Sequence, residues 1–136
     1  MSEYKFSTEV KIRISDINYG NHVGYDRYFL LFQEARIDYL KSLGFSELDL
    51  GGPGLIITEA NCKYRAELLL AEVVEVKCKT TDISSKSFTL EYKIEKDGKT
   101  CATGYTKNMA FDYEKKKPIS VPHDFISAIK KFEGIS

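Results

Sequence analysis

The stretch RISDINYGNHVGYDRYFLLFQEARIDYLKSL, residues 13–43, decides the fold, because a polar loop runs directly into a long amphipathic helix. Its apolar side chains recur at helical spacing and stop before Gly44, a residue type that commonly ends helices. The spacing predicts a helix over residues 26–43, with Asp26 as its N-cap. So wide an apolar face needs a sheet to cover it. The stripe comprises Tyr28, Leu31, Phe32, Ala35, Tyr39, Leu40 and Leu43.

A strand precedes this segment and an antiparallel meander follows it. Val10, Ile12 and Ile14 alternate with polar residues, which is the pattern of a half-buried strand. After position 54 the period is again two, and Asp97-Gly98 between two such runs predicts a type I′ hairpin turn. Segregated helix and strands predict an α+β protein with one main sheet, but they do not predict the strand order. The expected strands cover residues 55–64, 72–82, 86–95 and 100–112, and a short helix is expected over 123–132.

Length and composition limit the classes of function. The 136 residues are expected to form one domain over 1–136, and 20 basic side chains balance 20 acidic ones. Nucleic acid is therefore not an expected partner. No apolar run suits a membrane span or a signal peptide, so we expect a cytoplasmic protein with no membrane partner. The three widely spaced cysteines match no zinc or redox motif, and two histidines make a metal site unexpected.

The opening segment resembles the signature of hot-dog-fold acyl-CoA thioesterases of the 4-hydroxybenzoyl-CoA thioesterase type. Their motif is roughly D-x-D-x-x-G-H-V, then Tyr, then E-A-R on an aromatic-rich helix. The resemblance implies an antiparallel sheet wrapped around one long central helix. It also implies an acyl-CoA or acyl carrier protein thioester as substrate and a homodimer or homotetramer with sites at the subunit interface. Hydrolysis needs no cofactor beyond the coenzyme A of the substrate. The motif stands here as Asp16-Ile17-Asn18-Tyr19-Gly20-Asn21-His22-Val23, then Tyr28, then Glu34-Ala35-Arg36.

The resemblance also implies catalytic roles for residues of the loop and the helix. A backbone N–H at the helix start, that of Tyr25 or a neighbour, would polarise the thioester carbonyl. The position of the family's usual catalytic acid is Asn18, whose amide is neither a base nor an anionic nucleophile. Three bases stay open. Glu34 ranks first because it could face one cleft with Asn18, and Asp16 and His22 follow.

Each of these side chains also has a structural interpretation. Polar residues in a loop before a helix mostly satisfy backbone N–H groups, and this role is favoured for Asp16 and His22. For Asn18 the structural and catalytic roles are equally supported. The missing acid also leaves open an alternative function, a non-catalytic module that binds acyl thioesters. A dehydratase of the same fold is disfavoured, because its His-containing helix motif is absent.

Further residues are candidates for substrate binding. Aromatic side chains around Tyr28 are expected to wall an acyl pocket, with Thr58 of the next strand opposite. The family often places phosphate contacts where Lys86 stands between Ser85 and Ser87. Lys63 and Arg65 are the other candidates for the nucleotide end of coenzyme A, and we expect them to share a basic surface with Lys86.

Overall fold

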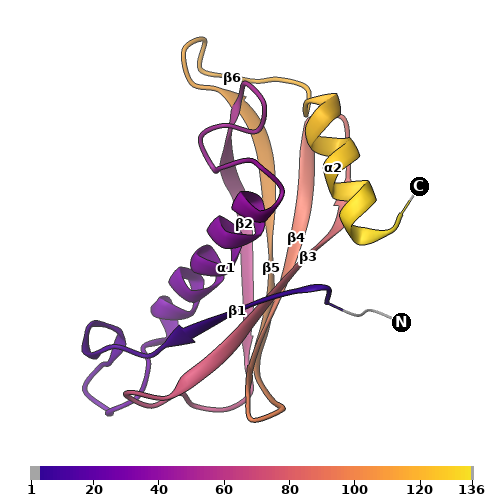
Figure 1. Cartoon of the computed structure of the whole chain (residues 1–136). Helices are drawn as coiled ribbons and strands as arrows, with labels where there is room; N and C mark the ends of the chain where they lie inside the picture. The colour runs from indigo at the N-terminus through magenta and orange to yellow at the C-terminus, as the bar shows by residue number, and fades with distance from the viewer. Residues whose placement is uncertain (1–3, 136) are drawn as a thin grey trace.

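An antiparallel sheet curls around one long helix in the computed structural model, which describes residues 4–135 (Figure 1). Within these residues the sheet has six strands in the order β1-β3-β4-β5-β2, and β6 pairs with β5. The two helices are α1 (Tyr28–Ser42) and α2 (His123–Glu133). This is the predicted α+β hot-dog architecture. The strands are β1 (Phe6–Lys11), β2 (Gly54–Tyr64), β3 (Val73–Ile83), β4 (Ser87–Lys96), β5 (Lys99–Asp112) and β6 (Lys117–Pro118).

The first two strands lie at opposite edges of the main sheet. β1 pairs with β3 and β2 pairs with β5, so α1 crosses the concave face between them (Figure 1). The turn between β4 and β5 has Asp97 at φ +52° and Gly98 at φ +79°, as a type I′ turn requires. None of the helices in the described part of the chain is long and apolar enough to cross a membrane.

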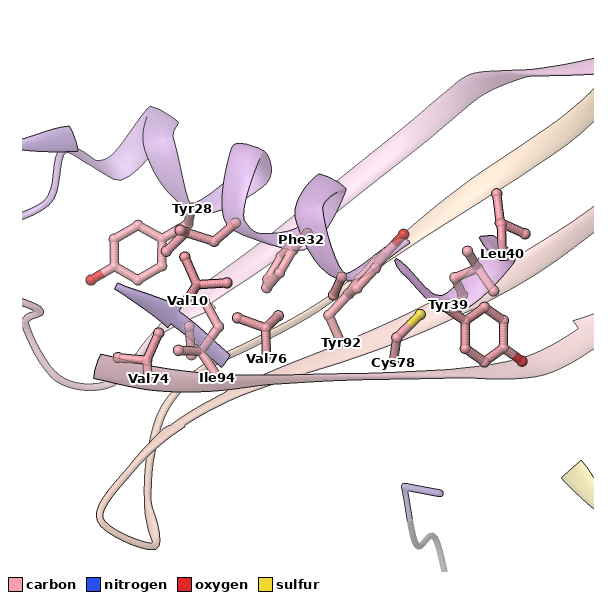
Figure 2. Packing of buried hydrophobic residues seen from close by; sticks show 14 of the residues in the cluster. Val10, Tyr28, Phe32, Tyr39, Leu40, Val74, Val76, Cys78, Tyr92 and Ile94 are labelled. Carbon is pink, nitrogen blue, oxygen red and sulfur yellow. The ribbon is translucent and has the colours of Figure 1, made fainter. Parts of the chain in front are cut away.

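The core forms where α1 rests on the sheet. The ring of Phe32 stacks on that of Tyr92 at 4.6 Å with an interplanar angle of 10° (Figure 2). Gly104 of β5 lies against the ring of Phe32. A Cβ at this position would stand 2.6 Å from Cε2 of Phe32 and would collide with the carbonyl oxygen of Asn61. The absent side chain therefore permits the close approach of helix and sheet.

The second helix closes the far end of the core. Phe125 of α2 packs edge-on against Phe45 and Phe88. Glu133, the last residue of α2, accepts a hydrogen bond from the hydroxyl of Tyr39 at 2.5 Å and one from the N–H of Thr80 at 3.2 Å. These contacts join α2 to both α1 and β3.

Three local expectations need correction. Asp26 does not cap the helix: it lies inside a 3₁₀ turn, Tyr25–Arg27, that leads into α1, and α1 has no side-chain cap. Ile14 is not a strand residue. It lies in a second 3₁₀ turn, Ile14–Asp16, and is 73% exposed, because Asp16 turns the chain after β1. Cysteines of a cytosolic chain are also expected to be buried and reduced; all three are free, but Cys62 is only half-buried.

Candidate active site

Asp16 anchors the loop that precedes α1. Its carboxylate accepts a hydrogen bond from the N–H of Arg13 at 2.9 Å, and its carbonyl accepts one from the N–H of Gly24 at 3.1 Å. Asp16 is only 6% exposed. A buried carboxylate that caps a turn in this way stabilises the loop. The structural interpretation of Asp16 is therefore the one that its contacts support.

A tight turn follows between Asn18 and His22. The side-chain oxygen of Asn18 accepts a hydrogen bond from the N–H of Gly20 at 2.9 Å, and the N–H of Asn18 donates to the carbonyl of His22 at 3.0 Å. Asn21 takes the left-handed conformation at φ +63° that closes the turn. The carbonyl oxygen of the Asn18 side chain is thus occupied, and its NH₂ group stays available as a donor.

The imidazole of His22 has one nitrogen engaged. Nδ1 lies 3.2 Å from the carbonyl oxygen of Val23, and a carbonyl can only accept, so Nδ1 is the donor in this contact. In the tautomer that donates from Nδ1 alone, Nε2 is an acceptor. A Cβ built on Gly20 would stand 2.8 Å from Nε2 and 3.5 Å from the side-chain oxygen of Asn18. The imidazole and the amide therefore lie beside the same point of the loop.

These side chains line a groove of about 380 Å³ at the start of α1. Tyr25 begins the 3₁₀ turn, so its N–H has no partner within the helix. The hydroxyl of Tyr64 donates to the carbonyl of Tyr25 at 2.7 Å, and its ring packs edge-on against Tyr28 at 4.8 Å. Burial raises the pKa of Tyr28 to about 12, so this hydroxyl stays neutral. The lining residues are Asn18, His22, Val23, Tyr25, Tyr28, Tyr64, Arg65, Ala66 and Glu67.

Glu34 lies elsewhere in the described chain. Its carboxylate accepts a hydrogen bond from Nη2 of Arg13 at 2.8 Å, and its side chain is 38% exposed. It does not line the groove that holds Asn18 and His22. The expectation that Glu34 and Asn18 face one cleft is therefore not met within a single chain.

Comparison with known proteins identifies the family. The family model of the Thioesterase-like superfamily matches residues 12–129. The chain belongs to this superfamily. The predicted family, fold and thioester-hydrolase class are thereby confirmed.

Individual relatives are similar over nearly their whole length. A solved gentisyl-coenzyme A thioesterase is 26% identical, with a TM-score of 0.83 over 91% of this chain and 99% of its own. The DHNA-CoA thioesterase of Staphylococcus aureus is 26% identical, with a TM-score of 0.85 over 94% of this chain and 90% of its own. An acyl-CoA thioesterase of Haemophilus influenzae is 21% identical over 94% of this chain and 96% of its own.

The predicted basic surface of this thioesterase does not form within one chain. Arg65 lines the groove, and its N–H bonds to the carbonyl of Cys101. The carbonyl of Lys86 instead bonds to the N–H of Ala110, nine positions further along β5, or about 30 Å at the rise of a strand. Lys86 therefore lies at the opposite end of the sheet from Arg65, together with its neighbours Ser85 and Ser87.

The remaining candidates and the missed residues lie on or just after β2. Lys63 is exposed and next to Tyr64 in the sequence, but it lines a different pocket, together with Lys93 and Tyr105, and not the groove. Thr58 stands beside the bulge in β2, where its hydroxyl donates to the carbonyl of Lys107 at 3.4 Å, and it does not line the groove. Tyr64 and Glu67 also line the groove, although they were not among the expected site residues. The stretch 64–68 resembles a strand landmark of the family, but its residues reach the groove only because the end of β2 lies beside the helix start.

Proposed function

We propose that this thioesterase hydrolyses acyl-CoA in the groove at the start of α1. One observation carries the proposal: the groove brings together a helix-start N–H without an intrahelical partner and an imidazole whose Nε2 is free to accept a proton. The relatives named above as thioesterases of gentisyl-coenzyme A and DHNA-CoA support the choice of substrate class.

The N–H of Tyr25 would polarise the thioester carbonyl. It stands at the positive end of the 3₁₀ turn and α1, where negative charge is stabilised. The hydroxyl of Tyr64 donates a hydrogen bond to the carbonyl of Tyr25, which keeps the turn ordered. A donor that is already oriented stabilises the oxyanion without reorganisation during the reaction.

His22 would act as the general base. Nε2 takes a proton from water while the water oxygen attacks the thioester carbon, and a tetrahedral oxyanion forms. When the oxyanion collapses, the C–S bond breaks and the thiol of coenzyme A leaves with the proton from His22. The NH₂ group of Asn18 would orient the water or the thioester. Asp16 and Glu34, by contrast, are both paired with Arg13.

The nucleotide end of coenzyme A would contact Arg65, assisted by Lys63. Arg65→Ala should raise KM for an acyl-CoA several-fold and leave kcat within about twofold, because the contact is remote from the reacting carbon. Lys86→Ala is the matched control, because within one chain Lys86 lies at the opposite end of the sheet from Arg65. A KM raised only by Lys86→Ala would refute the placement at Arg65, and it would show that a second copy brings Lys86 to the groove.

A homodimer would form through the free edge of β2. This strand pairs only with β5 among the described strands, and it carries exposed apolar side chains, including Ile57 at 40% and Tyr64 at 47%. Long apolar edges favour pairing with a second strand, and a two-fold axis makes the contact self-complementary. A homotetramer would need a second interface. Location in the cytoplasm, hydrolysis without a cofactor and an acyl carrier protein as alternative donor stay predictions.

Turnover of an acyl-CoA panel tests this function directly. The protein is incubated with acetyl-, hexanoyl-, palmitoyl- and benzoyl-CoA, and the free thiol of coenzyme A is detected. We expect hydrolysis of at least one thioester, with activity lost in His22→Ala. If the protein binds an acyl-CoA in calorimetry but releases no thiol from any of them, the alternative of a non-catalytic binding module replaces the proposal.

A further inference from the structure

A second cavity, of about 470 Å³, lies on the face of the sheet that points away from α1. Glu91 and Lys93 of β4 line it, and they alternate along the strand with Tyr92 and Ile94, whose buried side chains pack toward the helix. The volume is in the range of small-molecule sites. The side chains around the cavity include those of Tyr4, Lys63, Glu91, Lys93, Thr103 and Tyr105.

A row of lysines crosses the sheet at this cavity. Lys77 of β3 stands opposite Lys93 of β4. Thr103 of β5 stands between Lys93 and Lys63 of β2. Because neighbouring strands are about 4.8 Å apart, Lys93 and Lys63 start about 10 Å from each other, with Thr103 between them. Like charges directly opposite each other destabilise a sheet, so the row is costly unless anions neutralise it.

Glu95 neutralises part of this positive charge. Its two carboxylate oxygens lie 3.1 Å from Nζ of Lys77 and 3.4 Å from Nζ of Lys93. Lys63 forms no ion pair within residues 4–135. One carboxylate shared by two ammonium groups leaves a positive excess beside the cavity, although the whole chain has as many acidic as basic side chains. The row therefore favours an anion as ligand.

Two tyrosine rings also line the cavity. Nζ of Lys79 lies 4.6 Å from the centre of the Tyr4 ring, a cation–π contact that holds this ring against the sheet. Burial raises the pKa of Tyr4, so its hydroxyl stays neutral and does not repel an anion. The hydroxyl of Tyr105 donates a hydrogen bond to the carboxylate of Glu59, which holds the second ring. Aromatic side chains are the usual platforms for the flat ring of a nucleobase.

Glu91 adds an acceptor to the site. It stands between Lys79 of β3 and Tyr105 of β5, in the row of the sheet next to that of the lysines. An ionised carboxylate only accepts hydrogen bonds, so Glu91 suits an amino group such as that of adenine. The cavity thus offers donors in one row and an acceptor in the next.

We infer that this cavity binds a nucleoside phosphate, with the phosphate between Lys93 and Lys63 and the base beside Tyr4 and Glu91. A phosphate group carries a charge of about −1.5 to −2 and strong acceptor oxygens, which match two ammonium groups and the hydroxyl of Thr103. The cavity shares no lining residue with the groove at the start of α1. It is a binding site separate from the proposed thioesterase site, and it does not depend on the hydrolysis of acyl-CoA.

Calorimetry of the full chain with ADP and with adenosine tests the phosphate contact. We expect ADP to bind, and adenosine, which lacks the phosphates, to bind at least about tenfold more weakly. Lys93→Gln removes one cation and should raise the dissociation constant for ADP by about tenfold or more. Lys131→Gln on the exposed face of α2 is the matched control and should leave this constant within about twofold. Circular dichroism checks that each variant folds.

Arg65→Ala separates this cavity from the groove. The proposed function places the nucleotide end of coenzyme A at Arg65, so ADP bound in the groove would need this side chain. We expect Arg65→Ala to leave the dissociation constant for ADP within about twofold. A loss of ADP affinity in Arg65→Ala, an unchanged affinity in Lys93→Gln, or no binding of ADP at millimolar concentration overturns the inference. None of these results decides the proposed function, which is tested separately by release of the thiol of coenzyme A.

Discussion

Arg13 links the two acidic residues that the motif offered as bases. Its N–H binds the carboxylate of Asp16, and its guanidinium binds Glu34. Residue types alone cannot separate a catalytic carboxylate from a paired one, because both occur in polar loops beside helices. Of the polar side chains between residues 16 and 22, those of Asn18 and His22 line the groove.

Replacement of Asp16 should reduce stability. Asp16→Ala leaves the N–H of Arg13 without its acceptor, and we expect a loss of about 1.5–3 kcal/mol in the free energy of unfolding. Urea unfolding followed by circular dichroism measures this loss. Asp26→Ala, which removes an exposed carboxylate that caps nothing, is the control and should change the value by less than about 0.5 kcal/mol. A stable Asp16→Ala variant without activity would instead assign Asp16 to catalysis.

At the level of the elements, α1 is held by one close approach to the sheet. Gly104→Ala would push a methyl group into the ring of Phe32 and against the backbone of β2. We expect this overpacking to cost about 1–3 kcal/mol of stability. Thermal and urea unfolding report it, with Thr103→Ala on the neighbouring position of β5 as control. Equal stability of the two variants would show that α1 does not depend on this contact.

The bounds of the helices and strands could be predicted from the sequence far better than the order in which the strands pair. β4 was expected over residues 86–95 and is Ser87–Lys96, because one buried face imposes a strict period of two. The position of β1 at the edge opposite β2 could not be predicted, since it depends on the path of α1 across the sheet. The same limit applies to the site. His22 and Tyr25 follow from the motif, whereas the pairing of Glu34 with Arg13 depends on how β1 and α1 pack.

For the whole molecule, the free edge of β2 predicts a dimer. Ile57→Glu places a charge on this edge, and we expect it to raise the dissociation constant of the dimer by at least about tenfold. Light scattering and analytical ultracentrifugation measure the change. Ile135→Glu is the matched control, because Ile135 is 46% exposed and Ile57 is 40% exposed. If both variants and the unaltered protein are monomers at micromolar concentration, the account of the interface is wrong.

The central claim is that the loop at the start of α1 carries the chemistry and that His22 is its base. The most direct measurement compares kcat of His22→Ala and Glu34→Gln on the acyl-CoA that the unaltered protein hydrolyses best, with folding of each variant checked by circular dichroism. We predict that His22→Ala lowers kcat by about 100-fold or more, as loss of a positioned general base does, and that Glu34→Gln lowers it by less than about threefold. Near-full activity of His22→Ala together with an inactive Glu34→Gln would contradict the account and place the base on the helix.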